Sequence, residues 1–318
     1  MTNAIEEPVV KEGKVSNVIF DSQLLSTLMS CPRKANLTFN EQWTNKGGKS
    51  NSLEVGSLAH VILEFYSKAI MNGKLRNDAI DEGFAAGKEY VVGYHPDNKY
   101  ITDPSEIGIK NTPLETYDGM PAYVIPVDRA VATMVEYFDY YRNDMWTIIG
   151  VEDVRGRVIY EDEELRIIWK AKYDLIVDTN AGLSSVDRKT SKQRKDTVEL
   201  NNQFIGQGTI LHSQNVIIDK IGWQKTLKPQ EKFTRPVLSY SPDIMAEWTQ
   251  EIVPYYARMW VAYQDAGYFP PNYTSCENKY GLCNYYKDVC RMDRSMREES
   301  LKVFFDVGKK WDINNDDD

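Results

Sequence analysis

Two short segments carry charged residues at a spacing that could support hydrolytic chemistry. In VDRKTS, Asp187 and Lys189 are two positions apart, so in a β-strand their side chains project from the same face. Asp174, in the preceding run KAKYDLIVD, would lie across a hairpin within about 5 Å. Paired carboxylates repel each other, and a hard divalent cation such as Mg²⁺ relieves that repulsion. A lysine beside the cation can orient a water molecule and offset charge on a phosphoryl transition state.

These three residues also fit a simpler interpretation, an ion pair on an exposed sheet. From these three residues alone the ion pair is the favoured interpretation. Apolar residues recur at helical spacing from Leu53 to Met71, and this helix would place Gly56, His60 and Glu64 on one face. A single histidine in an apolar helix is more often a hydrogen-bonded core residue than a metal ligand. Glu64 would support the site rather than bind the metal.

The elements that must position these residues follow from the spacing of apolar residues. Helices are expected at residues 21–36, 53–71, 79–92, 127–144, 199–212 and 242–266. From Thr147 the pattern changes to β-rich runs, which predict a three-stranded meander that carries both aspartates. The run NVIIDKIGWQ predicts a further buried strand after the fifth helix. Strands and helices in this order predict an α/β domain around a mixed sheet of about four strands.

One large domain accounts for most of the 318 residues. Its predicted limits are 19–306, between a flexible start at 1–18 and an acidic tail at 307–318. A helical insertion at about 73–146 contains a proline-punctuated excursion long enough to form a lid. A segment with three cysteines, 276–290, follows the last helix.

The composition is that of an ordinary globular protein, with 42% apolar and 27% charged residues. No stretch approaches the roughly 20 apolar residues that a membrane-spanning helix needs. The amino-terminal residues MTNAIEEPVVKEGK are acidic where a secretion signal would be basic. The sequence therefore predicts a cytoplasmic protein with no membrane segment.

The charge is unevenly distributed along the chain. A net charge of −9 argues against a nucleic-acid partner, yet residues 185–235 carry ten Lys or Arg against five Asp or Glu. The predicted phosphate contacts are Lys192, Arg194, Lys195 and Lys225, followed by Lys220, Lys228, Lys232 and Arg235. Trp223 could stack on a base. The alternative is a solvated loop, which is the common fate of a charge run.

The motifs in this order resemble those of the PD-(D/E)XK nuclease superfamily, in particular its RecB-like branch of CRISPR-adaptation and phage exonucleases. The resemblance spans about residues 20–291 and rests on GSLAHVILE, YDLIVD, VDRKTS and NNQFIGQ. It implies a restriction-endonuclease-like α-β-β-β-α-β core. It also implies site roles. The implied metal ligands are His60, Asp174, Asp187 and the backbone carbonyl of Arg188. Lys189 would be the catalytic base or water-orienting group, and Gln203 would position Lys189 or the substrate strand.

Two residues depart from the family pattern. Gln207 stands where the family usually has a tyrosine, so a stacking or phosphate contact would be lost. The glycine common before the first aspartate is replaced by Lys172-Tyr173, which would perturb the hairpin but not the ligands.

Four cysteines form a second candidate site: Cys31, Cys276, Cys283 and Cys290. Four thiolates are the ligand count of a 4Fe-4S cluster or a structural Zn²⁺ ion. The resemblance implies such a clasp, because related nucleases place one cysteine on the first helix and three near the carboxyl end. Six residues separate each adjacent pair in the tail, where the family has a tight C-x-x-C. The alternative is four free thiols.

The resemblance implies a Mg²⁺- or Mn²⁺-dependent DNA hydrolase, an exonuclease acting on DNA ends or single strands. By analogy its setting would be recombination, repair or phage DNA metabolism in the host cytoplasm, with a helicase or recombination protein as partner. Two alternatives stay open: a catalytically inactive DNA-binding or assembly module of the same fold, and a sequence-specific endonuclease.

Overall fold

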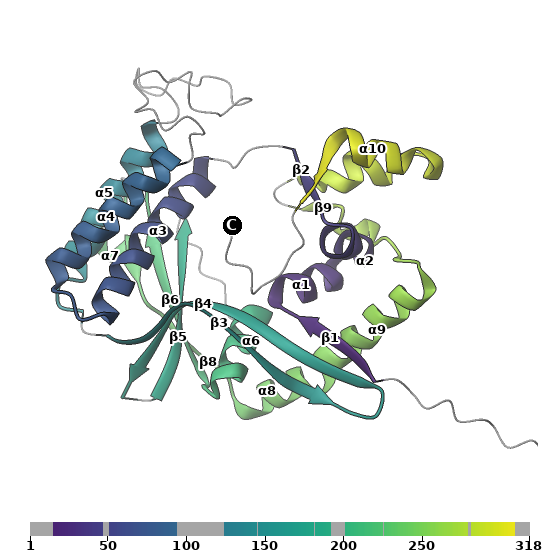
Figure 1. Cartoon of the computed structure of the whole chain (residues 1–318), viewed down its shortest axis with the longest axis horizontal. Helices are drawn as coiled ribbons and strands as arrows, with labels where there is room; N and C mark the ends of the chain where they lie inside the picture. Colours follow the sequence, from purple (N-terminus) through teal and green to yellow (C-terminus); the bar gives the residue numbers. More distant parts are fainter. Residues whose placement is uncertain are drawn as a thin grey trace, which may run out of the picture.

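A mixed seven-stranded sheet forms the centre of the molecule in the computed structural model (Figure 1). The structure describes residues 15–46, 51–93, 124–144, 146–180, 182–191, 201–224, 226–278 and 281–308. The sheet strands are β1 (Ser16–Phe20), β3 (Thr147–Glu161), β4 (Leu165–Thr179), β5 (Gly182–Ser191), β6 (Asn215–Gly222), β7 (Phe233–Thr234) and β8 (Val237–Ser239). They follow the path β1-β4-β5-β6-β7, with β3 paired to β4 and β8 paired to β6.

Helices cover both faces of this sheet. On one face lie α3 (Asn51–Met71), α4 (Arg76–Gly93) and α5 (Val124–Tyr140), which Figure 1 shows as one stack. The other face is covered by α1 (Ser22–Ser30), α6 (Asn202–Leu211), α8 (Pro242–Glu247), a π-helical turn (Trp248–Ile252) and α9 (Val253–Ala266). A short helix, α7 (Pro229–Lys232), precedes β7. Each layer has its own apolar core, and both faces of the sheet are covered except along β4 near Arg166 and Lys172, which are exposed.

Strand β4 changes partners halfway along its length. Residues Leu165 to Trp169 pair in parallel with β1, and residues Leu175 to Thr179 pair antiparallel with β5. Between these two stretches the edge of β4 is open, and α6 packs there. The Tyr173 hydroxyl donates to the Gln207 carbonyl at 3.0 Å, and the Gln207 side chain donates to the Lys172 carbonyl at 3.3 Å. Gln207 therefore closes a backbone gap, which explains why it is almost fully buried.

A small module at the carboxyl end packs on the segment that follows α1. It contains α2 (Pro32–Ala35), a π-helical turn (Asn36–Asn40), β2 (Trp43–Asn45), β9 (Glu277–Asn278), β10 (Gly281–Leu282), a second π-helical turn (Tyr286–Cys290), α10 (Arg297–Phe304) and β11 (Phe305–Val307). Two short single-turn helices, at Tyr273–Ser275 and Arg294–Met296, complete it. Strand β2 pairs antiparallel with β11, so chain segments about 260 residues apart close the module.

The predicted order of helix, three strands, helix and strand is confirmed, with a larger sheet than expected because β1, β7 and β8 extend it. The first helix ends earlier than predicted, since Pro32 starts a separate turn. No described helix has the length and apolar character required to cross a bilayer. The expected flexible start falls mostly outside the described residues, as do the acidic tail and most of the lid.

Candidate metal centre

The site lies where the β4–β5 ladder ends. Leu175 opposite Val186 is the last registered pair, so Asp174 and Asp187 face each other one step beyond it. At this point a side chain replaces the backbone acceptor: Asp174 Oδ2 accepts a hydrogen bond from the backbone N–H of Arg188 at 2.6 Å. The two aspartates are therefore opposite each other on adjacent strands, as predicted.

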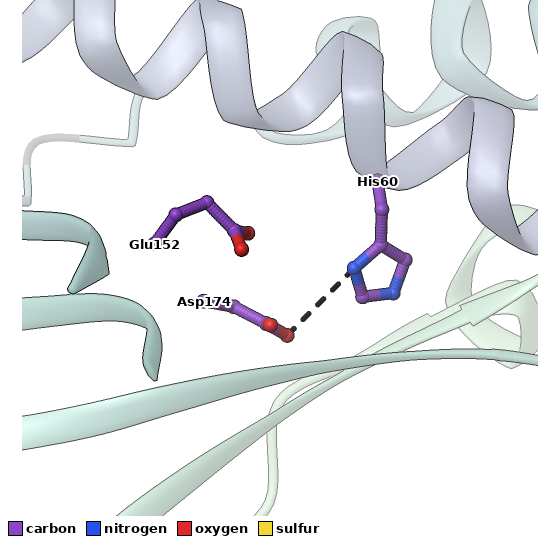
Figure 2. Close-up of side chains that lie close together, drawn as sticks. All are labelled: His60, Glu152 and Asp174. Atoms are coloured by element: carbon purple, nitrogen blue, oxygen red, sulfur yellow. Dashed lines mark ion pairs between the residues drawn. The ribbon is translucent and has the colours of Figure 1, made fainter. Parts of the chain in front are cut away.

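Helix α3 reaches this point because of a glycine. A Cβ atom on Gly56 would lie only 2.7 Å from Oγ1 of Thr190 on β5, so any larger residue would push the helix away from the strand. One turn further along, His60 faces β4, and its Nδ1 lies 3.9 Å from Asp174 Oδ2 (Figure 2). The predicted helix therefore delivers the predicted histidine to the first aspartate.

A third candidate ligand, Glu152, comes from β3, and no sequence motif marked it. One ligand atom each from His60, Glu152 and Asp174 lies within 4.8 Å of the others, and Figure 2 shows the three side chains pointing toward one another. Glu152 has a left-handed backbone with φ of 50°, a conformation that costs a non-glycine residue about 1 kcal/mol or more. The available signal was an isolated acid in the β-rich run IIGVEDV, which carried no motif.

Asp187 is held by a different set of partners. Its Oδ2 lies 2.7 Å from Lys189 Nζ, and its Oδ1 accepts a hydrogen bond from Gln203 Nε2 at 2.6 Å. Lys189 Nζ also donates to Gln203 Oε1 at 3.3 Å. Gln203 is positioned by the start of α6, where the Asn201 side chain accepts the Gln203 backbone N–H. The predicted acid, lysine and glutamine are thus brought together beside the three-ligand group.

Burial and like charges shift the pKa values of the site. Burial raises the pKa of Asp187 to about 6, with Asp174 adding to the rise and Lys189 opposing it. Burial also raises the pKa of Glu152, and Asp174 raises it further. Burial lowers the pKa of His60, which favours the neutral imidazole that a metal requires. A bound cation would stabilise the ionised forms of Glu152 and Asp187, whose pKa values are raised.

The donor set fits a hard or borderline divalent cation. Carboxylate oxygens suit Mg²⁺ and Mn²⁺, and one imidazole nitrogen is acceptable to Mn²⁺ in particular. His60, Glu152 and Asp174 would hold the ion, with Asp187 and the Arg188 carbonyl as the remaining predicted ligands. The Arg188 side chain takes no part, because it is buried and donates to Ser67 Oγ at 2.7 Å.

Several predicted nucleic-acid contacts have other roles. Lys232 is buried, with its ammonium 2.5 Å from Glu136 Oε2, and Arg235 is enclosed in a buried polar cluster. Trp223 is 7% exposed and packs in the core beneath α3 and α5, so it cannot stack on a base. These three predictions were wrong, because the strand and hairpin that carry the residues fold back into the domain. Lys192, Arg194, Lys195 and Lys225 lie outside the described residues.

The four cysteine thiols are free and lie near one another. Burial is the main cause of the raised pKa of Cys276, and the other three thiols raise it further. The Cys283 backbone N–H donates to the Cys276 carbonyl at 2.7 Å, which ties two of them across the β9–β10 turn. Among the described residues, no three cysteine sulfurs lie within 4.8 Å of one another.

The family model of the PD-(D/E)XK nuclease superfamily matches residues 23–291. The chain therefore belongs to the PD-(D/E)XK nuclease superfamily. A crystal structure of a protein from Eubacterium rectale, provisionally named an exonuclease, is similar with 15% identity and a TM-score of 0.42, covering 88% of this chain and 91% of that one. At this level the likeness does not inform the activity. No curated protein matches the chain.

Proposed function

We propose that the protein is a metal-dependent DNA nuclease that acts as an exonuclease on DNA ends or single strands. The observation that supports it is the meeting of His60, Glu152 and Asp174 beside a lysine-paired aspartate at the end of the β4–β5 ladder. Four chain segments contribute to this site, and a surface ion pair would not require them to converge. A role in recombination, repair or phage DNA metabolism, alongside a helicase, rests on family analogy.

Each residue has a role in this proposal. His60, Glu152 and Asp174 bind the divalent cation, which supplies Lewis acidity at the scissile phosphate. Lys189 orients the attacking water, and its ammonium offsets the charge that develops on the phosphate. Gln203 contacts both Lys189 and Asp187, so it fixes the position of the lysine.

The decisive experiment is digestion of end-labelled single-stranded, duplex and circular DNA, with Mn²⁺ and with a chelator. We expect metal-dependent release of nucleotides from linear DNA, abolished in Lys189→Ala and retained in the matched control Lys302→Ala, an exposed lysine paired with Glu298. Wild-type protein that cuts no form of DNA would support the alternative of a catalytically inactive binding module. Cutting of circular duplex would support the endonuclease alternative.

For the cysteines we propose a 4Fe-4S cluster held by Cys31, Cys276, Cys283 and Cys290. The other three thiols lie close enough to Cys276 to raise its pKa, and this closeness supports a shared ligand. Protein purified without oxygen should be brown and contain about four iron atoms per chain. Colourless protein that carries zinc would favour the zinc alternative, and protein without either metal would leave free thiols.

A further inference from the structure

A row of basic side chains runs along one face of the long β3–β4 hairpin toward the metal centre. Over its first ten residues, strand β4 alternates: the core-facing positions are Leu165, Ile167, Trp169, Ala171 and Tyr173, all 8% exposed or less. The intervening positions on the opposite face include Arg166, Lys170, Lys172 and finally Asp174. Since alternate residues of a strand share a face, the three basic residues and the metal-binding aspartate lie in one line.

The strand beside this row leaves it uncovered. The β3 residues opposite Lys172, Lys170 and Ile168 are Val154, Gly156 and Val158. The Lys170 side chain lies across Gly156, since a Cβ there would stand 3.3 Å from its Cγ. The side chains of Arg166 and Lys172 are 44% and 47% exposed. The basic groups are thus supported from one side and open to solvent.

The acids that face this row are few and weakly engaged. Arg166 lies 3.7 Å from Glu161, with both side chains exposed, and such pairs contribute at most about 1 kcal/mol. Lys172 lies 3.2 Å from Glu152, which is itself in the metal centre. A cation bound by Glu152 would weaken the attraction between that carboxylate and the Lys172 ammonium.

We infer that Arg166, Lys170 and Lys172 form a phosphate track that binds the backbone of one DNA strand and leads it to the metal centre. This inference rests on the proposed nuclease function and names the path of its substrate. Lys170 and Lys172 are two positions apart, about 7 Å, and Arg166 to Asp174 spans about 27 Å of strand. A single row of cations matches the single backbone of one strand. The hairpin that carries the track runs from the centre of the molecule to the end beside β1 (Figure 1).

The test is the salt dependence of binding, measured by fluorescence anisotropy with a labelled single-stranded oligonucleotide and Mn²⁺ in the non-cleaving Lys189→Ala background. The double variant Arg166→Gln/Lys170→Gln removes two track charges. The slope of log K against log salt should fall by about 1.4, or 0.7 for each lost phosphate contact. The matched control is Arg155→Gln/Arg157→Gln, which removes two arginines from the opposite face of the same hairpin.

The control should keep the wild-type slope, because its residues face away from the track. An unchanged slope in the track variant, or an equal fall in both variants, overturns the inference. Thermal melting of both variants shows whether the fold is intact, and these exposed substitutions should leave it so. Absence of cleavage by the wild-type chain overturns the proposed function instead, so the two failures are distinguishable.

Discussion

Two partly buried clusters of charged residues lie on neighbouring strands of the sheet, and they are built in opposite ways. In one, Arg235 donates to Asp219 at 3.0 Å and to Asp144 at 2.5 Å. Its guanidinium carbon lies 3.5 Å from the Tyr141 ring centre and 3.9 Å from that of Trp146. There one guanidinium is paired with two carboxylates. In the metal centre, Glu152 and Asp174 converge with His60, whose pKa is lowered by burial.

The difference separates a structural cluster from a functional one. A paired, hydrogen-bonded cluster is stable as it stands, and breaking it leaves a buried charge without compensation. Two converging acids, one of which is Glu152 with a raised pKa and a left-handed backbone, persist only where the surrounding fold enforces them. The first cluster should therefore contribute to stability, and the second to catalysis.

The largest effect should come from Asp174→Asn. Asparagine can still accept the Arg188 backbone N–H, so the strand geometry is kept while a metal ligand loses its charge. We expect metal-dependent cleavage to fall roughly 10³-fold, with the free energy of unfolding changed by less than about 1 kcal/mol. Initial rates and urea unfolding measure the two quantities. Asp178→Asn, exposed on the same strand, is the control, and a tenfold loss or less would contradict the role of Asp174.

Arg235→Met should show the reverse pattern. Loss of the guanidinium leaves the buried Asp219 without its main partner, so the free energy of unfolding should fall by about 3–5 kcal/mol. Cleavage per folded molecule should be unchanged. Arg258→Met, which removes an exposed arginine paired with Asp162, should cost at most about 1 kcal/mol. Similar losses in the two variants would remove the distinction between buried and exposed pairs.

Asp21 tests a third kind of buried acid, one held by backbone donors. It caps α1 by accepting the Leu24 N–H at 2.7 Å, and burial raises its pKa from 3.8 to about 6. The folded state therefore binds this proton more tightly than the unfolded state. As pH rises from about 4 to about 7, the contribution of Asp21 to stability falls by roughly 3 kcal/mol.

Asparagine also caps helices, so Asp21→Asn should keep the hydrogen bond and remove this pH dependence. Urea unfolding of both proteins at several pH values measures the difference. The variant should gain stability relative to the wild type as pH rises, and parallel pH profiles would rule out the raised pKa.

Glu152→Gln should have the smallest effect on the stability of the metal-free protein, and its main effect should be on metal binding. Mn²⁺ affinity should fall at least roughly tenfold, because a charged ligand is lost. Without metal, the variant should be as stable as the wild type or slightly more so, since one of two repelling acids is removed. Mn²⁺ titration and the metal-induced rise in melting temperature report both effects. Glu161→Gln, exposed on the same strand, should change neither, and equal Mn²⁺ binding by both variants would exclude Glu152 as a ligand.

The sequence was most informative where periodicity and short spacing carry the signal. The alternation in β4 and the two-residue step from Asp187 to Lys189 place these side chains correctly, because strand geometry is local. The helix that delivers His60 was predicted for the same reason. Gln203 lies where the motif order placed it, at the start of the helix after β5.

The missed features are all contacts between distant segments. Glu152 carries no motif, and only the pairing of β3 with β4 brings it opposite Asp174. The sequence predicted a basic, aromatic surface at Lys232, Arg235 and Trp223. In the structure the β6–β8 region folds so that these side chains are largely enclosed. A charge run shows which residues are ionised, and it does not show which of them are enclosed.

The sequence by itself determined the elements, their order and the identity of most reactive groups, because these follow from local spacing and side-chain chemistry. The tertiary structure decided which charges face each other and which are already neutralised. That distinction depends on burial and on cross-strand register, which arise only when separate segments of the chain pack together. It makes Arg235 part of the scaffold, Glu152 part of the metal centre, and the alternating lysines of β4 a candidate path for DNA.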